Sequence, residues 1–422
     1  MSLKNRSKDM TPFDMARRPV KQNPFLMPLV WGVCYVMTKM QGLDRVRRIG
    51  MDGLKPPFLV IASHQGFSDY YIAPRALFPH RASYISDMEG FAAFGNELYR
   101  QIGCIGKRRY TADLSVVRNV RYALDVLGQP VVIFPESRHC DAGVTSTLPD
   151  NLGKLIKHLG VPVAVLTANG SYLANPFWDE ERTRRTKLSA DIEAVFTSDD
   201  VERLPEDEIQ RIIADKLRYD EYAYQWENRI SIKDRPAQGL HLPLYKCRKC
   251  LCEGQMQGSG DILRCRACGA KWVMDEYGRL SADGEYIHIP DWYRWERKMA
   301  EEEASEGYDI SFAVRVEALP NEKGFVPLGT GTLRHNAEGF ELSLDKEYDG
   351  LADVFPLRIP SKALPSVQTE YNYRGRGKCV VLSSKNCCYY CYSDDPRFIV
   401  TKLEFIGEYF YSLSHGDAIH IK

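Results

Sequence analysis

The chain has 422 residues and a formal net charge of zero, because 56 Lys and Arg residues balance 56 Asp and Glu residues. A neutral total argues against a general nucleic-acid binder, which carries a basic surplus or a basic stripe. Apolar residues make up 44% of the chain and charged residues 27%, which excludes a largely disordered protein. The length exceeds that of one compact core, so we expect several domains.

The first 50 residues combine basic and apolar sequence. Residues 1–21 lack the apolar stretch and cleavage site of a secretory signal, so we expect a cytoplasmic protein. The most apolar window, residues 25–40, is shorter than the roughly 20 residues that a membrane-spanning helix needs, and Pro28 and Lys39 interrupt it. Basic residues flank the window: Arg17, Arg18, Lys21, Arg45, Arg47 and Arg48.

This window has two interpretations. A short apolar helix with basic flanks is expected to lie in the interface of an anionic membrane, which makes residues 1–50 a peripheral segment on the cytoplasmic face. The alternative is a first helix packed into the core, since buried helices are also apolar all round.

Strand-like apolar runs alternate with helical patterns between residues 57 and 169. This alternation predicts an α/β domain with a largely parallel sheet, which we expect to span residues 51–235. Reactive groups in such domains gather where the strands end. Helices are expected near residues 69–77, 90–102, 111–127, 152–159 and 205–217.

Two pairs of cysteines with CxxC spacing follow this domain. Cys247 and Cys250 form the first pair, Cys265 and Cys268 the second, and fourteen residues separate the pairs. In a reducing compartment this spacing favours metal binding over disulfides. Four thiolates predict a closed, structural zinc site in a zinc ribbon, expected over residues 243–290. Because the chain has no basic surplus, we expect such a ribbon to contact a protein or to act as a rigid spacer.

The remaining chain predicts a charged connecting helix at residues 291–307 and a mostly-β module at residues 308–422. Short alternating runs with Gly, Asn and Asp turn signals precede a closing helix near residues 399–413. The order of these elements resembles a pleckstrin-homology or GRAM-like module. Four further cysteines fall in this module and are expected to be buried in its core: Cys379, Cys387, Cys388 and Cys391.

A histidine and a carboxylate follow the apolar run at residues 58–62. His64 and Asp69 have four residues between them and lie at the expected junction of a strand and a helix. A neutral imidazole accepts a proton from an alcohol at physiological pH, and a carboxylate on its other nitrogen stabilises the imidazolium. The pair therefore predicts a general base, although a helix cap is the simpler alternative for one such pair.

Charged residues follow two other apolar runs. Glu136 and Arg138 come after residues 131–134, and Lys107, Arg108 and Arg109 come after residues 104–106. Cationic side chains at strand ends bind phosphate well, whereas a solvated basic turn is the alternative.

Residues 58–169 resemble the glycerolipid acyltransferase superfamily, which includes 1-acylglycerol-3-phosphate acyltransferase. The four blocks of that superfamily occur in order. Its N-H-x-x-x-x-D block corresponds to residues 63–69, its glycine-to-arginine block to 103–109, its F-P-E block to 134–136, and its final V-P-V block to 161–163. Two positions depart from the pattern: Ser63 replaces the usual Asn, and Arg138 stands one place before the usual Arg.

The resemblance implies the role of each matched residue. His64 would be the catalytic base and Asp69 its partner. Arg109 or Arg108, together with Lys107, would bind the acceptor phosphate. Glu136 would position the acceptor, and the shifted arginine, Arg138, would also contact it.

The implied reaction moves a fatty acyl group from acyl-CoA or acyl-carrier protein to the hydroxyl of a lysophospholipid. Backbone amides at the start of the helix after His64 are candidates for binding the oxyanion. Two alternatives remain open. One is an acceptor without phosphate, such as an amino-lipid or glycolipid hydroxyl, and the other is a membrane-docked regulatory or scaffold protein.

Overall fold

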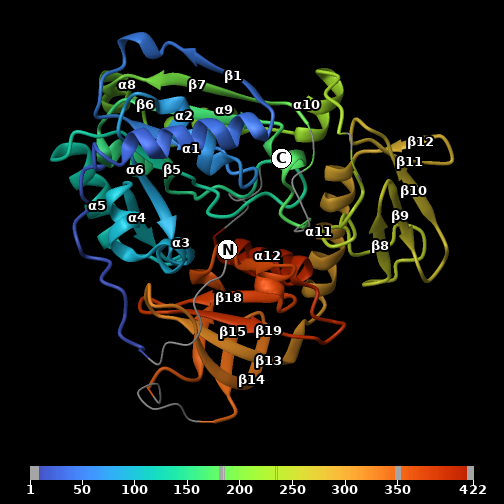
Figure 1. Cartoon of the computed structure of the whole chain (residues 1–422). Helices are drawn as coiled ribbons and strands as arrows, with labels where there is room; N and C mark the ends of the chain where they lie inside the picture. Colours follow the sequence, from blue (N-terminus) through green and yellow to red (C-terminus); the bar gives the residue numbers. More distant parts are fainter. Residues whose placement is uncertain are drawn as a thin grey trace.

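The computed structural model describes residues 9–179, 184, 186–232, 234, 236–346 and 353–415. The ends of the expected N-terminal segment and β module, residues 1–8 and 416–422, lie outside the described residues, as does the expected boundary residue 235. Three separate sheets follow one another along the chain (Figure 1).

The first sheet has seven strands in the order β1-β7-β6-β2-β5-β3-β4. Its strands are β1 Leu43–Ile49, β2 Leu59–Ala62, β3 Ser83–Asp87, β4 Cys104–Lys107, β5 Val131–Ile133, β6 Val163–Asn169 and β7 Leu188–Phe196. All neighbouring pairs are parallel except β6 and β7. The predicted α/β domain with a largely parallel sheet is therefore confirmed.

Apolar layers cover both faces of this sheet. Leu59 and Ile61 of β2 belong to one buried cluster, and Val60 and Ala62 belong to another. Successive strand residues point to opposite faces, so a strand buried on both sides is apolar at every position. This double burial fixes the carboxyl end of β2, where His64 follows.

The helices of this domain agree largely with the sequence pattern. They are α1 Met27–Met40, α2 Asp69–Leu77, α3 Met88–Phe94, α4 Asn96–Gln101, α5 Leu114–Asp125, α6 Leu152–Leu159, α7 Ser171–Ala174, α8 Ser198–Arg203, α9 Glu206–Leu217 and α10 Glu221–Glu227. The single helix expected at residues 90–102 is two helices, because Gly95 with a φ of 84° ends α3. Strands β1 and β7 were not predicted, since charged residues are frequent in and around both; β1 falls in the expected N-terminal segment 1–50 but pairs with β7 in the first sheet.

The second sheet lies beside the four paired cysteines, of which Cys265 ends β9 and the other three lie in the segments before β8 and between β9 and β10. Its five strands are β8 Met256–Ser259, β9 Ile262–Cys265, β10 Lys271–Met274, β11 Leu280–Ala282 and β12 Glu285–Ile287, and all neighbours are antiparallel. Trp272 of β10 packs against Trp292 of the long helix α11, Ile289–Ser305, with ring centroids 4.8 Å apart.

The third sheet is antiparallel, with the strand order β16-β15-β14-β13-β19-β18-β17. It comprises β13 Asp309–Leu319, β14 Val326–Asn336, β15 Gly339–Leu344, β16 Leu357–Pro360, β17 Gln368–Glu370, β18 Cys379–Ser383 and β19 Cys388–Tyr392, and helix α12, Val400–His415, closes the module. The four cysteines of this module are buried, as expected. In Figure 1, α12 lies between the third sheet and the first domain.

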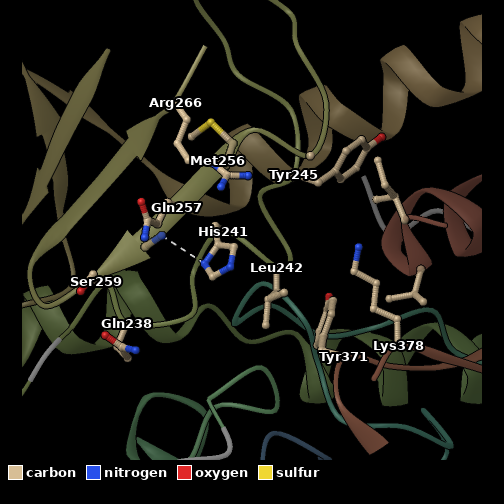
Figure 2. Close-up of a pocket in the computed structure, with 14 residues that line it drawn as sticks. Gln238, His241, Leu242, Tyr245, Met256, Gln257, Ser259, Arg266, Tyr371 and Lys378 are labelled. Carbon is tan, nitrogen blue, oxygen red and sulfur yellow. Dashed lines mark hydrogen bonds between the residues drawn. The ribbon is translucent and has the colours of Figure 1, made fainter. Parts of the chain in front are cut away.

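A cavity of about 450 Å³ lies where the second sheet meets the C-terminal module (Figure 2). Residues of the connecting segment 238–245 also line it. Among the described residues, no helix has both the length and the apolar character needed to cross a membrane.

Candidate active site

His64 lies in the loop that joins β2 to α2, and Asp69 stands where that loop ends. Asp69 is the first residue of α2, and its Oδ2 accepts hydrogen bonds from the backbone N–H groups of Gln65 at 2.6 Å and Gly66 at 3.0 Å. Ser171 Oγ donates to Asp69 Oδ1 at 2.7 Å. His64 Nδ1 lies 3.5 Å from Asp69 Oδ2, so the structure brings the predicted pair together at just over hydrogen-bond length.

These contacts occupy the two amides that directly follow His64. The backbone N–H groups of Gln65 and Gly66 both donate to Asp69. They hold the carboxylate beside the imidazole, and they are not free for substrate.

Glu136 lies behind His64. Its Oε1 accepts from the backbone N–H of His64 at 2.9 Å, and its Oε2 accepts from that of Ser146 at 2.7 Å. The side chain is 2% exposed. Burial raises the pKa of Glu136 to about 7. The geometry therefore places Glu136 as a brace of the His64 loop and not in the cavity that the acceptor would enter.

A small cavity of about 40 Å³ opens beside His64. Tyr70 lines it, with its hydroxyl 3.3 Å from His64 Nε2. Lys107 and Arg109 line the cavity, as the sequence predicted for acceptor-binding residues, and so do Ser86, Asp87, Phe134 and Ser137. The volume suits about one water molecule and not a lipid headgroup, so substrate binding requires side chains to move.

Both cationic side chains in this cavity have partners. Lys107 Nζ donates to Ser137 Oγ at 3.0 Å. Arg109 Nη2 donates to Asp87 Oδ2 at 2.5 Å. Burial and the charge of Arg109 lower the pKa of Lys107 to about 8, so the amine is still mainly cationic at neutral pH.

Burial controls the protonation of the histidine and its carboxylate partner. Desolvation, together with the nearby charge of Arg109, lowers the pKa of His64 to about 3. Desolvation raises the pKa of Asp69 to about 6, although its three hydrogen-bond donors oppose the rise. At neutral pH the imidazole is therefore neutral and the carboxylate is ionised, which is the state that a general base requires.

Two predicted acceptor-binding residues do not line the cavity. Arg108 donates to the carbonyl oxygens of Pro320, Lys385 and Asn386 in the C-terminal module. Arg138 forms ion pairs with Asp141 and with Glu404 of α12. Both guanidinium groups are buried and hold the first domain to the C-terminal module, so the expectation that they bind the acceptor is not supported by this geometry.

Two aromatic neighbours of His64, His139 and Tyr70, were not predicted as site residues. His139 is 7% exposed, and its ring centroid lies 4.2 Å from that of His64. Its Nε2 has no hydrogen-bond partner among the described residues. Tyr70 is next to Asp69 in the chain, so adjacency to the matched block was the only available signal for it.

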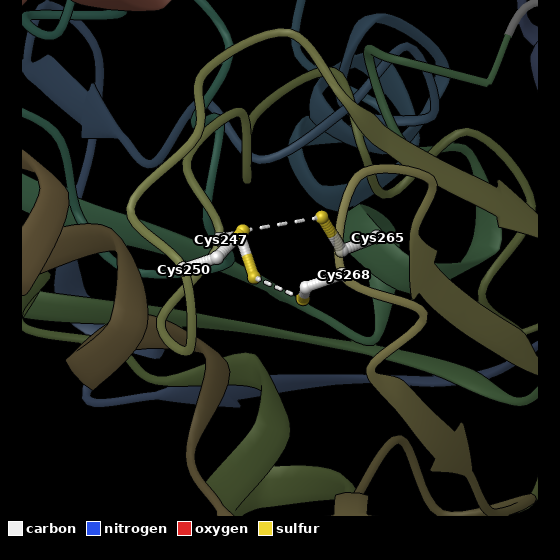
Figure 3. Close-up of side chains that lie close together, drawn as sticks. All are labelled: Cys247, Cys250, Cys265 and Cys268. Carbon is white, nitrogen blue, oxygen red and sulfur yellow. Dashed lines mark hydrogen bonds between the residues drawn. The ribbon is translucent and has the colours of Figure 1, made fainter.

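The four paired cysteines form a compact cluster (Figure 3). Their Sγ atoms all lie within 4.8 Å of one another, with Cys247 and Cys268 3.8 Å apart and Cys250 and Cys265 3.6 Å apart. A tetrahedron with Zn–S bonds of about 2.3 Å has edges of about 3.8 Å. The cluster therefore has the size and donor atoms to hold a metal ion.

The comparison with protein families supports an acyltransferase enzyme. Residues 37–167 match a family model whose description is "Acyltransferase". The first domain therefore contains an acyltransferase-family domain. The match covers both the His64 loop and the cationic residues after β4.

No curated protein matches the chain. Among solved structures, the crystal structure of the 1-acyl-sn-glycerophosphate acyltransferase PlsC from Thermotoga maritima matches with 17% sequence identity and a TM-score of 0.35. The match covers 46% of this chain and 79% of that one. A likeness this distant does not define the substrate or the site.

Proposed function

We propose that the protein is a glycerolipid O-acyltransferase that transfers a fatty acyl group from acyl-CoA or acyl-carrier protein to the hydroxyl of a lysophospholipid. The observation that carries this proposal is the neutral, buried imidazole of His64. Its Nε2 faces a small cavity, and its Nδ1 faces an ionised carboxylate.

In the proposed reaction, the acceptor hydroxyl replaces the Tyr70 hydroxyl beside Nε2 of His64. The hydroxyl proton moves to Nε2 while the oxygen bonds to the thioester carbonyl carbon. The tetrahedral intermediate then collapses, the C–S bond breaks, and the thiolate leaves with the proton from the imidazolium. Asp69 stabilises that imidazolium.

Substrate binding also adjusts the strength of the base. In the present geometry the low pKa of His64 makes the imidazole a weak base. The separation of 3.5 Å between Nδ1 and Asp69 leaves room for a true hydrogen bond to form in the substrate complex. Such tightening favours the charged imidazole and raises its pKa towards the working pH.

Lys107 and Arg109 support an acceptor that carries phosphate, because both line the cavity at the end of β4. Cationic donors to phosphate give strong, charge-assisted hydrogen bonds. Asp87 favours a second candidate, an acceptor without phosphate, because it already neutralises Arg109. The third candidate, a regulatory or scaffold protein, makes no use of the His64 environment.

We also propose that α1 docks on the cytoplasmic face of a membrane. Its exposed apolar side chains form one stripe along the helix: Leu29, Val33, Val36 and Met40, with Phe25 just before it. The opposite face packs on α2, where Arg75 donates to Thr38 Oγ1 at 2.7 Å. Because α2 begins at Asp69, membrane docking of α1 would bring the site to its lipid substrate.

The cysteine cluster is proposed to hold a structural zinc ion. Four thiolates close the coordination shell, which leaves no position for catalysis. The resulting ribbon and the C-terminal module are proposed to support the acyltransferase domain or to contact a protein partner.

The deciding experiment incubates pure protein with radiolabelled acyl thioesters and a panel of lysolipids in vesicles, with and without phosphate. Transfer to lysophosphatidate that disappears in the folded His64→Ala protein supports the proposal. An Arg109→Met variant should then raise the KM for lysophosphatidate about tenfold or more and leave the KM for the thioester unchanged, because one charge-assisted hydrogen bond is lost. Transfer only to acceptors without phosphate selects the second candidate, and no transfer to any lipid selects the scaffold.

A further inference from the structure

The cavity between the second sheet and the C-terminal module has a cationic lining with no carboxylate. Its cationic side chains are Arg266 and Lys378, and its imidazole is that of His241. All three residues are remote from His64 in the chain. Figure 2 shows the ring of His241 and the amine of Lys378 facing the same space. The cavity is therefore a second polar site outside the acyltransferase chemistry.

Arg266 and Lys378 have no anionic partner among the described residues, and neither forms an ion pair or a side-chain hydrogen bond there. Other cations nearby are paired. Glu253, adjacent to the lining residue Gly254, binds both Lys246 and Lys402. Among the described residues, no carboxylate therefore neutralises Arg266 or Lys378.

His241 adds a fixed hydrogen-bond donor. The backbone N–H of Gly258 donates to His241 Nδ1 at 3.0 Å, so the neutral ring carries its proton on Nε2. Burial and the charges of Lys378 and Arg266 lower the pKa of His241 to about 4, which keeps the ring neutral. Val400, the first residue of α12, also lines the cavity, and the positive end of that helix dipole adds to its potential.

Apolar side chains form part of the remaining lining, beside the polar side chains of Gln238, Gln257 and Ser259. Leu242 and Met256 form one part of it, and Ile399 and Val400 form another. A volume of about 450 Å³ lies within the range of small-molecule sites, and a few polar groups on an apolar wall are typical of them.

We propose that this cavity binds a phosphate-bearing ligand of nucleotide size, with the phosphoryl group on Arg266, Lys378 and His241. The apolar body of the ligand packs on Leu242 and Met256. Guanidinium, ammonium and imidazole N–H groups are all hydrogen-bond donors, and the oxygens of a phosphoryl group are all acceptors. The three side chains therefore match a phosphoryl group, and no negative side chain of the lining would repel it.

Two sources supply this chemistry, the nucleotide end of a coenzyme-type thioester and a free nucleotide. A row of aromatic rings runs from the cavity to His64. The distance between ring centroids is 5.6 Å for Tyr371 and Phe177, 5.8 Å for Phe177 and His139, and 4.2 Å for His139 and His64. These rings contact one another from the lining of one cavity to the lining of the other. The binding site itself rests on its own lining and not on the proposed function.

The test is isothermal titration calorimetry of the full-length, zinc-loaded protein with adenosine 3′,5′-bisphosphate, and with adenosine as the uncharged control. The bisphosphate should bind at least tenfold more tightly than adenosine. Its affinity should fall as salt is raised, because exposed charges such as Arg266 are screened. Tighter binding of coenzyme A than of the bisphosphate identifies the donor as the source, and equal or weaker binding identifies a free nucleotide.

Substitutions locate the binding. Lys378→Met and Arg266→Gln should each weaken the bisphosphate about tenfold or more, since each removes one charge-assisted contact. Lys271→Met, an exposed cation of β10 outside the cavity, should have no effect. Equal affinity for adenosine and the bisphosphate, wild-type binding by Lys378→Met, or no binding at all would overturn the proposal.

His64→Ala separates this proposal from the proposed function. The variant should bind the bisphosphate like the wild type while losing acyl transfer. An active enzyme without bisphosphate binding overturns the new site alone, and an inactive enzyme that binds it overturns the proposed reaction alone.

Discussion

Arg138, two residues after the brace Glu136, forms an ion pair with Glu404 of α12, which lies 266 positions further along the chain. Thr369 Oγ1 donates to the same carboxylate oxygen at 3.1 Å, and Arg138 also pairs with Asp141 at 3.1 Å. The C-terminal helix is thus joined by buried charges to the loop behind His64.

Glu404→Gln should lower the free energy of unfolding by about 3 kcal/mol or more, because it leaves the buried guanidinium of Arg138 without one of its two carboxylates. Urea unfolding followed by tryptophan fluorescence measures the change. Glu302→Gln, an exposed carboxylate on α11, is the matched control and should stay within about 0.5 kcal/mol of the wild type. The double variant Arg138→Met with Glu404→Gln should cost less than the sum of the single changes, and strict additivity would contradict the buried pair.

His64→Ala should reduce kcat about 10²- to 10⁴-fold while the protein stays folded, since an unassisted alcohol is a poor nucleophile. Asp69→Asn should also lose most activity, because the amide cannot stabilise the imidazolium. Single-turnover acyl transfer measures both. The double variant should be no slower than His64→Ala alone, and full activity in a folded His64→Ala protein would end the proposed mechanism.

In a plot of kcat/KM against pH, the loss of activity on the acidic side should follow the protonation of Asp69 and not that of His64. The pKa of Asp69 is raised to about 6, so its carboxylate loses its charge as the pH falls through 6. The pKa of His64 is lowered to about 3, so the ring does not titrate there. Activity should therefore fall below about pH 6. The Asp69→Asn variant should lose this acidic decline, whereas an unchanged decline in that variant would assign it to another group, with Glu136 as the first candidate.

Zinc removal should unfold the second sheet, because metal binding in such ribbons is coupled to folding. Elemental analysis should find about one zinc per chain, and a strong chelator should abolish the near-ultraviolet signal of the Trp272 and Trp292 pair. Cys268→Ser should have the same effect. Cys252→Ser is the control, since this exposed cysteine lies outside the cluster. A metal-free protein with an intact tryptophan signal would refute the ribbon.

The protein should float with vesicles that contain anionic lipid. Leu29→Ser with Val36→Ser should weaken this binding about tenfold or more, because each exposed side chain contributes transfer free energy on burial. Leu114→Ser, an equally exposed apolar residue on α5, is the control. Arg45→Glu and high salt should weaken binding further by removing the electrostatic attraction. Unchanged binding by the double serine variant would exclude α1 as the docking helix.

Much of this protein was determined by local sequence. The alternation of apolar runs and helical patterns predicted the parallel α/β domain, and the CxxC spacing predicted the four-cysteine cluster. The proximity of His64 and Asp69 was predicted because only four residues lie between them in the chain. Hydrophobic period, turn residues and ligand spacing act over a few residues, so each is visible without the fold.

Only the tertiary structure decided the roles of the arginines. Arg108 and Arg109 are adjacent in sequence, yet the first binds carbonyl oxygens of the C-terminal module and the second lines the cavity beside His64. The amides of Gln65 and Gly66 were likewise committed to Asp69. A guanidinium or an amide has the same donors in any sequence context, and its function depends on which acceptors the folded chain brings within about 3 Å of it.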